Sequence, residues 1–391
     1  MSKCTFKKLS MMRAPEMPDI REILREIALI LREKRYDPSR YKERDDLAYW
    51  VLQFLGADTI PVGDCEKKIP IDRLGFYQLS DYDEYNVAKE PAELVMVGKP
   101  TPLVKLYIER KRRPPYIWAK LEWYNPFSLS VKDRIAWQMI RLSLENCKLP
   151  QYEGMIEVSS SNTGIALAAL SAILGVNFKV ILPSFAPIEN ERILRLLGAD
   201  VERTDAGITT ELIDKVKKEA EKHHLYHPDQ FNNDANLLAH MRYTARELLI
   251  QLQHVGVKPS KLVLLSGTSG TASAVSFVLT NYYHDDPPKT YIVTPAPNEK
   301  IEGIRRLETG VKWLDMIGVK YEVIEVTRSE ALNGIKQAAR VNGIIPGVSG
   351  GAAFAAIKKL YDNGELELMD NIVTIIPDTG FKYPKAIEKI I

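Results

Sequence analysis

Residues 262–271 read LVLLSGTSGT. Four apolar residues, Leu262–Leu265, run directly into a loop of glycines and hydroxyl side chains, and a pattern of helical length, Thr271–Thr280, follows. A short apolar run of this kind is typical of a strand that is buried on both faces, as in a parallel sheet covered by helices. The segment therefore predicts one strand–loop–helix unit of an α/β fold.

The same alternation extends along the chain from Pro100 onward. Strands are expected over 117–123, 155–158 and 178–182, and helices over 132–144, 163–174, 188–197 and 235–252. The segments 291–294, 328–341, 350–361 and 372–376 continue the pattern. We predict mostly parallel sheets, with ligands bound in the loops beyond the carboxyl ends of the strands.

The first hundred residues have a different pattern. Asp19–Tyr36 and Asp46–Leu55 are expected to be helices, whereas Gly56–Lys99 is irregular and rich in Asp, Tyr and Pro. We predict an N-terminal extension over residues 1–97 that serves as a cap or as a dimer arm.

The composition excludes several classes of protein. The chain has 391 residues, enough for two or three domains, and its 53 basic and 51 acidic residues leave a net charge of +2. This balance gives no electrostatic footprint for nucleic acid. The cysteines, Cys4, Cys65 and Cys147, form neither a disulfide framework nor a zinc spacing. Because Met1–Pro18 lacks an apolar signal segment and no membrane span is evident, we expect a cytoplasmic protein.

The loop at Ser266–Thr271 favours an anionic ligand. Its glycines, Gly267 and Gly270, let the backbone approach a ligand, and free N–H groups at a helix start bind phosphate. The hydroxyls of Thr268, Ser269 and Thr271 add further donors. No Walker GK[ST] or Rossmann GxGxxG pattern is present. The alternative is a plain glycine-rich turn.

Three other loops precede expected helices. Asn125–Arg134 places Lys132 in a first helical turn, where the helix dipole disfavours its charged form; the alternative is a solvated lysine. Ser159–Gly164 has more hydroxyl and amide groups than one helix cap requires, so it either binds a carboxylate or ring oxygen or is simply a serine-rich cap. Gly347–Gly351 places Ser349 between glycines.

Together, in this order, the loops resemble the fold-type II pyridoxal-phosphate (PLP) enzymes of the cysteine synthase family. The motifs that carry the resemblance are KPTPLV (Lys99–Val104), KLEWYNPFSLSVKDR (Lys120–Arg134), SSSNTG (Ser159–Gly164), QFNNDAN (Gln230–Asn236), GTSGT (Gly267–Thr271) and GVSGG (Gly347–Gly351). The resemblance implies a tryptophan synthase β-like fold with two parallel-sheet, three-layer domains. A larger PLP-binding domain would comprise 98–126 and 234–391, and a smaller mobile substrate domain 127–233.

The resemblance also implies residue roles. Lys132 resembles the lysine that carries the cofactor and acts as catalytic base, and Asn162 the asparagine that binds the cofactor's ring oxygen. Gly267, Thr268, Ser269, Gly270 and Thr271 resemble the phosphate loop. Ser349 resembles the serine facing the pyridine nitrogen, which makes the ring a weaker electron sink and favours β-elimination over transamination. The groups implied to hold the substrate carboxylate are Ser159, Ser160, Ser161, Thr163 and Gln230.

Two departures narrow the assignment. Ser161 replaces the glycine of the usual T-S-G-N loop, and IEGIRRLETG (Ile301–Gly310) places Arg305 and Arg306 where the acetylserine enzymes are uncharged. A guanidinium binds phosphate bidentately, so at least one arginine of this pair is predicted to bind a substrate phosphate, and Arg305 is the candidate because it lies closest to the Gly303 turn. The alternative is a surface arginine pair neutralised by Glu308. The pattern resembles the archaeal O-phosphoserine sulfhydrylase branch, as do the long extension and the ending PDTGFKY (Pro377–Tyr383).

The predicted reaction is a β-replacement, in which O-phosphoserine and sulfide give cysteine and phosphate in a homodimeric enzyme. The alternatives are an O-acetylserine sulfhydrylase, a cystathionine β-synthase, a serine or threonine dehydratase, and, from another class, a non-catalytic sensor of phosphate ligands. The absence of residues far beyond Tyr383 weakens the regulated synthase and dehydratase alternatives. His223, His224 and His227 lack the other ligands of a metal site, and His240 is expected to be a packed helix residue, so no metal is predicted.

Overall fold

The protein is described by a computed structural model that covers residues 5–8, 13–57, 59–62, 68–74, 85, 87–95, 100–184, 186–205 and 212–391. Cys4, Cys65 and Lys99 lie outside these residues, as does part of the predicted irregular stretch. The chain divides into two compact units. Unit 1 comprises Met1–Ser80, Pro100–Tyr124 and His240–Ile391, and unit 2 comprises Asp81–Lys99 and Asn125–Ala239. The three-part division predicted above stays a prediction.

Unit 1 contains a six-stranded sheet with the order β12-β11-β10-β13-β6-β5. The strands are β5 (Leu103–Tyr107), β6 (Tyr116–Leu121), β10 (Lys261–Leu265), β11 (Lys289–Pro295), β12 (Glu322–Val326) and β13 (Asn371–Ile376). All neighbours are parallel except β5, which runs antiparallel to β6 at the edge. The loops that follow β10, β11 and β13 therefore lie at one edge of the sheet, where ligands bind in such folds.

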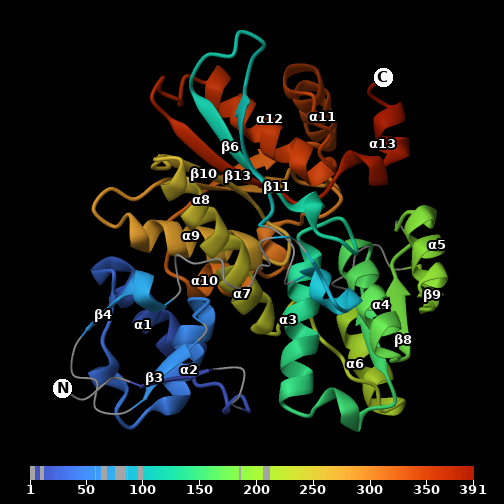
Figure 1. Cartoon of the computed structure of the whole chain (residues 1–391). Coiled ribbons are helices and arrows are strands. Elements are labelled where there is room, and N and C mark those ends of the chain that lie inside the picture. Colours follow the sequence, from blue (N-terminus) through green and yellow to red (C-terminus); the bar gives the residue numbers. More distant parts are fainter. Residues whose placement is uncertain are drawn as a thin grey trace. The chain divides into compact units, whose positions relative to one another are not determined.

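Helices cover both faces of this sheet, with α11 and α12 on one side and α8, α9 and α10 on the other (Figure 1). The helices are α8 (Arg246–His254), α9 (Gly270–Tyr282), α10 (Lys312–Met316), α11 (Arg328–Asn342), α12 (Val348–Asp362) and α13 (Pro384–Glu388). The packing of α11 on α12 is close, because a Cβ atom on Gly351 would lie 2.2 Å from the carbonyl oxygen of Ala331. With both faces covered, the central strands are buried, which explains why they read as continuous apolar runs.

Unit 2 is a smaller three-layer unit. Its parallel strands are β7 (Met155–Val158), β8 (Phe178–Leu182) and β9 (Asp200–Arg203), and its helices are α3 (Lys132–Glu145), α4 (Asn162–Leu174), α5 (Ile188–Leu196), α6 (Ile213–Lys222) and α7 (Ala235–Ala239). One apolar cluster joins the sheet to α3 and α4, and a second joins its other face to α6. Together with unit 1, this confirms the predicted α/β class with parallel sheets.

The N-terminal part of unit 1 is helical with short strand pairs. It contains α1 (Ile20–Glu33) and α2 (Asp45–Phe54), and β1 (Thr5–Lys8) pairs with β3 (Thr59–Val62) while β2 (Arg35–Tyr36) pairs with β4 (Ile69–Pro70). Asp19 caps α1 by accepting a hydrogen bond from the Arg21 N–H. The apolar face of α1 is buried, and the helix packs against α9.

The helix predicted over 235–252 is present, but it is not one regular α-helix. A wide π-helical turn, His240–Ala245, separates α7 from α8. Such turns insert an extra residue into a helix and are frequent at functional sites. Residues 235–249 are all buried, so no one-sided apolar period marks the insertion in the sequence. The turn brings His240 against the start of α9, as described below.

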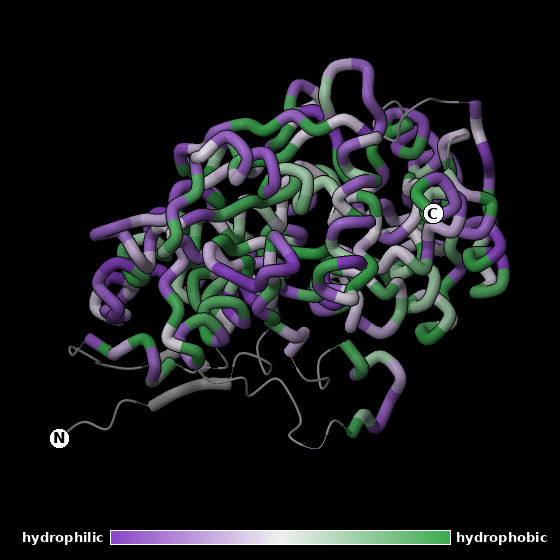
Figure 2. Tube along the Cα trace, turned by 90° about the horizontal axis from the view of Figure 1, so that it is seen from above, coloured by the Kyte–Doolittle hydropathy of each residue, from purple (hydrophilic) through white to green (hydrophobic). Residues whose placement is uncertain are grey.

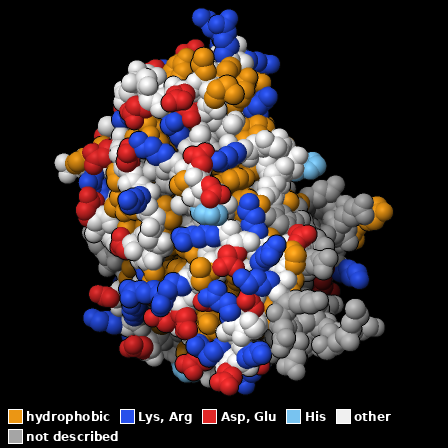
Figure 3. Space-filling view, turned by 90° about the vertical axis from the view of Figure 1, so that its left-hand side faces the viewer, with side chains coloured by type: hydrophobic (Ala, Val, Ile, Leu, Met, Phe, Trp, Pro, Cys, Tyr) orange, Lys and Arg blue, Asp and Glu red, His pale blue; other side chains and the backbone are white. Residues whose placement is uncertain are grey.

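Polar and apolar residues are interleaved along the chain. Hydrophobic stretches alternate with hydrophilic ones along the trace in Figure 2. On the face shown in Figure 3, basic and acidic side chains lie interspersed, in keeping with a net charge of +2.

Candidate active site

The predicted phosphate loop connects β10 to α9 in unit 1. The Ser266 hydroxyl anchors it by donating to the carbonyl oxygen of Val293 at 2.8 Å. Ser269 has a φ of +73°, in the left-handed region, immediately before the first residue of α9. It is 2% exposed, and its hydroxyl has no hydrogen-bond partner within the described part of the chain. A buried donor without a protein partner is costly unless a ligand binds it, so the loop fits a phosphate.

His240 lies behind this loop. It is fully buried, and its Nε2 and Nδ1 lie 3.1 Å and 3.0 Å from the hydroxyls of Thr271 and Thr244. The imidazole therefore fixes the orientation of the Thr271 hydroxyl in the first turn of α9. This contact of His240 was not predicted from the sequence, in which the spacing of His240 and Thr244 by four residues is the one signal for a pair.

The segment after β11 places the two arginines in different surroundings. The Arg305 Nε donates to the carbonyl oxygen of Gly267 at 2.9 Å and its Nη2 to that of Gly310 at 2.6 Å. Burial lowers the pKa of Arg305 to about 10, so the side chain stays charged at neutral pH. Arg306 forms ion pairs with Glu308 and Glu325 at 2.7 and 3.1 Å. The alternative reading, an arginine neutralised by Glu308, therefore describes Arg306, whereas Arg305 adjoins the phosphate loop.

The GVSGG loop packs against the segment that follows β13. Gly347 leaves no room for a side chain, because a Cβ atom there would lie 2.0 Å from Oδ1 of Asp378. The Asp378 Oδ2 accepts a hydrogen bond from the Tyr383 hydroxyl at 2.5 Å. Ser349, 3% exposed in the first turn of α12, lies next to Gly303. The PDTGFKY segment thus supports the Ser349 loop.

In unit 2, Lys132 is the first residue of α3. Asp133, fully buried, accepts hydrogen bonds from the backbone N–H groups of Phe127 and Ser128 at 2.7 and 2.9 Å. The Ser130 hydroxyl accepts from the backbone N–H of Lys132 at 3.1 Å. The turn is rigidly held, and the Lys132 side chain is partly buried.

The Ser159–Gly164 loop connects β7 to α4. The Ser159 oxygen accepts hydrogen bonds from the Ser161 and Gly164 N–H groups at 3.2 and 2.9 Å, as a helix cap does. The Ser161 hydroxyl donates to Oδ1 of Asn162 and accepts from Asn190. Ser160 and Asn162 are partly exposed in the same turn. Much of the hydroxyl surplus in the sequence therefore organises the loop itself.

Gln230 is also held within unit 2. Thr163 donates its hydroxyl proton to Oε1 of Gln230 at 2.7 Å, and the Gln230 Nε2 donates to the carbonyl oxygen of Val158 at 2.9 Å. The structure thus brings Ser159, Ser161, Asn162, Thr163 and Gln230 together around the carboxyl end of β7.

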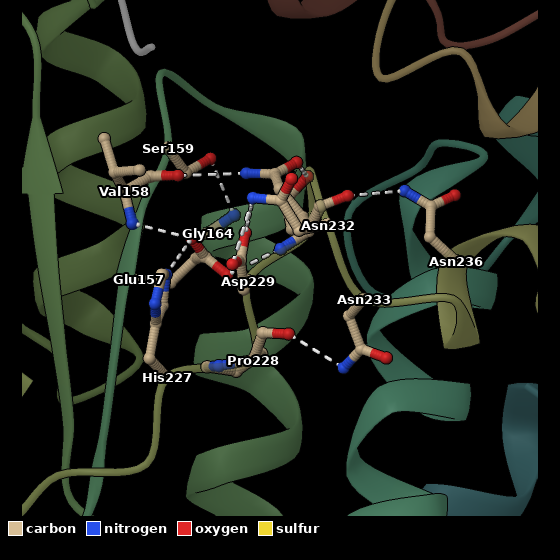
Figure 4. A network of polar contacts seen from close by, with 12 residues as sticks. Glu157, Val158, Ser159, Gly164, His227, Pro228, Asp229, Asn232, Asn233 and Asn236 are labelled. Atoms are coloured by element: carbon tan, nitrogen blue, oxygen red, sulfur yellow. Dashed lines mark hydrogen bonds and ion pairs between the residues drawn. The ribbon is translucent and has the colours of Figure 1, made fainter. Parts of the chain in front are cut away.

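A buried carboxylate underlies this arrangement (Figure 4). Glu157, fully buried on β7, accepts hydrogen bonds from the N–H groups of Val158 and Gln230. Its Oε1 lies 3.2 Å from Nε2 of His227. Burial alone lowers the pKa of His227, but the hydrogen bond and charge of Glu157 outweigh it, so the pKa is raised. From the sequence, Glu157 was predicted only as part of a strand, and His227 only as one of three histidines that bind no metal.

Neither a metal centre nor a membrane span is found in the part of the chain that the structure describes. No group of three His, Cys, Asp or Glu side chains there is arranged to hold a metal ion, and no helix there is long and apolar enough to cross a bilayer. His223 lies near Glu219, and His224 near the carbonyl oxygen of Gln151. The three histidines therefore have separate partners.

The residues fit the predicted cofactor. The unsatisfied Ser269 hydroxyl and the start of α9 suit its phosphate, and buried Ser349 has the neutral hydroxyl predicted to face its ring nitrogen. Each feature belongs to unit 1, while Lys132 and Asn162 belong to unit 2.

Comparisons with known proteins agree with this fit. Residues 95–378 match the family described as pyridoxal-phosphate dependent enzymes. A cysteine synthase of Staphylococcus aureus is 30% identical over 311 residues, which covers 76% of this chain and 97% of that protein.

Two solved structures are also similar. A hydrogen sulfide-producing enzyme of Fusobacterium nucleatum has a TM-score of 0.66 and 28% identity, covering 76% of this chain and 100% of that one. An O-acetyl serine sulfhydrylase of Entamoeba histolytica has a TM-score of 0.63 and 26% identity, covering 78% and 92%. With a family match over most of its length, the chain belongs to the pyridoxal-phosphate-dependent enzymes and uses that cofactor.

Proposed function

We propose that the protein is a cysteine synthase that replaces the phosphate of O-phospho-L-serine by sulfide to give L-cysteine. The observation that carries the choice of substrate is Arg305, a partly buried guanidinium hydrogen-bonded to the carbonyl oxygen of Gly267. A charged fork in a desolvated place binds a dianionic phosphate far better than a neutral acetyl ester.

The chemistry begins with removal of the substrate's α-proton. Bound PLP supplies the electron-withdrawing group that makes this proton acidic. The Nζ atom of Lys132 takes the proton as general base. Its place at the start of α3 favours the neutral amine that this role requires, because the positive end of the helix dipole disfavours a further charge. The clamp of Asp133 on the preceding loop keeps Lys132 in position.

The Ser159–Thr163 loop binds the α-carboxylate. The Ser159 oxygen already accepts two N–H groups, so its own proton remains for a carboxylate oxygen. Gln230 uses one of its two amide N–H groups on Val158, which leaves the second for the substrate. Thr163 donates its hydroxyl proton to Gln230, so we propose that Thr163 orients the Gln230 amide and does not contact the substrate itself. Backbone N–H groups and Ser160 complete the proposed carboxylate site.

The test compares two activated serines in the wild type and in three variants. Arg305→Ala should raise the KM for O-phosphoserine by about 10–100-fold, since a charged hydrogen bond contributes about 1.5–3 kcal/mol, and should leave the KM for O-acetylserine within about twofold. Arg305→Lys should recover part of the loss, because it keeps the charge without the fork. Arg306→Ala is the matched control.

The cofactor must be followed in the same samples. If Arg305 held the cofactor phosphate instead, Arg305→Ala would lose the visible absorption band of bound PLP and both KM values would rise alike. That result would refute the substrate role of Arg305.

A second candidate is an O-acetylserine sulfhydrylase. It is favoured by the similarity to the Entamoeba histolytica enzyme and by the two backbone carbonyls that already accept from Arg305. A wild-type kcat/KM that is higher for O-acetylserine than for O-phosphoserine would establish it. A protein that binds PLP yet turns over neither serine would support the sensor alternative. We further propose that the protein is a cytoplasmic homodimer. Light scattering of the purified protein tests the oligomeric state.

A further inference from the structure

A groove of about 720 Å³ lies within unit 1, away from the residues discussed so far. One wall is a stripe of α1 that carries Arg21 and Arg25, and the other is formed by the end of α9, the start of β11 and the residues before β12. Figure 1 shows α1 (blue) near α9 and α10 (orange). The volume is within the range of small-molecule sites.

The groove is strongly cationic. Five basic side chains and one acidic side chain line it. Lys289 is neutralised by Glu322 at 2.8 Å, and Arg32 donates to Oδ1 of Asn281. Within the described residues, Arg21, Arg25 and Lys320 form no ion pair. Three uncompensated cations in one concave surface repel each other, so an anion that binds among them relieves this repulsion.

Two buried hydroxyls point to a ligand independently of the charge. Thr280 on α9 and Thr290 on β11 both line the groove, and neither hydroxyl has a hydrogen-bond partner in the described part of the chain. Thr290 is only 2% exposed. A buried hydroxyl without a partner costs about 1–3 kcal/mol, and native proteins rarely retain one without an acceptor nearby.

The groove also has apolar walls, to which Phe277, Pro287 and Met316 contribute. Inorganic phosphate alone would leave these surfaces uncovered. An organic phosphate, with an apolar or aromatic body and at least two negative charges, would use the cations, the hydroxyls and the apolar surface together. We propose that this groove binds an organic phosphate of the nucleoside diphosphate class.

The site is separate from the proposed catalytic residues. Helix α9 begins at Gly270 in the phosphate loop, and Thr280 lies ten residues further along, about 15 Å at 1.5 Å per residue. The inference therefore does not depend on the substrate proposed above, and it stands or falls on binding alone.

The test is calorimetric titration of the full-length, PLP-loaded protein with ADP. Loading with PLP keeps ADP out of the Gly267–Thr271 loop. Arg25→Ala should weaken ADP binding by about tenfold or more, as expected for a charged hydrogen bond, whereas Arg340→Ala, an exposed arginine on α11, should leave it unchanged. Thr290→Val should weaken ADP binding and raise the unfolding midpoint of the unliganded protein. Valine has nearly the volume of threonine, so the substitution removes only the unsatisfied hydroxyl.

The other outcomes overturn the proposal. Pyrophosphate and adenosine should each bind more weakly than ADP. If pyrophosphate bound as tightly as ADP, the apolar walls would contribute nothing and the ligand would not be an organic phosphate. The proposal also fails if ADP does not bind, or binds equally to wild type, Arg25→Ala and Thr290→Val. A changed oligomeric state of Arg21→Ala or Arg25→Ala without ADP binding would show that a second copy of the chain occupies the groove.

Discussion

The two loops that follow β7 and β10 look alike in sequence but differ in how their hydroxyls are used. After β7, Ser159 caps its own helix and Thr163 holds Gln230. After β10, Ser269 is just as buried, but its hydroxyl has no hydrogen-bond partner within the described residues. The Ser159 oxygen of the first loop is used within the protein and only its proton remains for a ligand, whereas the second loop leaves a whole buried hydroxyl unsatisfied.

This difference separates two ways of building a binding loop. A loop that satisfies its own hydroxyls contributes to the stability of the unliganded protein and presents the donors that remain, chiefly backbone N–H groups. A loop with an unsatisfied buried hydroxyl gives up some stability and regains it when the ligand binds. Substitutions in the two loops should therefore have opposite signatures in stability and in affinity.

The largest expected effect is on kcat, and it comes from replacing Lys132, the proposed general base. Lys132→Ala should lower kcat by about 10²–10⁴-fold or more, because it removes the general base. The circular dichroism spectrum and the unfolding midpoint should stay close to those of the wild type, since Asp133 and Ser130 still hold the turn. Lys222→Ala, on an exposed position of α6, is the control and should keep full activity. Turnover retained by Lys132→Ala would contradict the assignment of the base.

The loop comparison itself is tested by a crossed pair of variants. Ser269→Ala should raise the dissociation constant of PLP by about tenfold or more with no loss of unfolding free energy, because only the ligand uses its hydroxyl. Ser159→Ala should lower the unfolding free energy by about 1–2 kcal/mol, because two backbone N–H groups lose their acceptor. PLP titration of the apoprotein and urea unfolding measure the two quantities. Equal losses of stability in both variants would end the distinction.

The contact between His227 and Glu157 in unit 2 (Figure 4) should make a smaller, pH-dependent contribution to the unfolding free energy. The pKa of His227 is raised in the folded protein, where burial lowers it but Glu157 more than compensates, with Asp229 adding to the rise. The stabilisation from His227 is therefore complete below the ordinary histidine pKa of about 6.5 and is lost as the pH rises through the folded value. The difference in unfolding free energy between wild type and His227→Gln should shrink from pH 6 toward alkaline pH. A difference that is constant or grows with pH would show that the pair acts otherwise.

The sequence predicted most of the regular structure because short apolar runs mark buried strands. The predicted strands 155–158 and 178–182 coincide with β7 and β8. The edge strands β5 and β12 were not predicted, since they alternate or expose their residues and carry no continuous apolar run. The π-helical turn at His240–Ala245 was not predicted either, because residues 235–249 are all buried and show no one-sided apolar period that an extra residue would shift.

The candidate site could be predicted only as far as local motifs allow. Lys132, the Gly267–Thr271 loop and Ser349 lie in short, recognisable segments. The hydrogen bond of His240 to Thr271 and that of Glu157 to the N–H of Gln230 join residues 31 and 73 positions apart. A single sequence contains no signal for such pairs. The sequence favoured Arg305 over Arg306 only by its place next to the Gly303 turn, and the different hydrogen-bond and ion-pair partners of the two arginines became visible only in the structure.

The smallest expected effect is that of replacing Arg306, and it tests the contrast between Arg305 and Arg306. Arg306 is the more exposed of the two arginines, and its guanidinium is neutralised by Glu308 and Glu325. Surface ion pairs of this kind contribute about 0–1 kcal/mol. Arg306→Ala should therefore change the unfolding free energy by less than about 1 kcal/mol and the KM for O-phosphoserine by less than about twofold. The same steady-state assay used for Arg305→Ala measures it. If Arg306→Ala instead raised the KM as much as Arg305→Ala does, the phosphate would be recognised by the positive charge of the whole segment rather than by the one guanidinium beside Gly267.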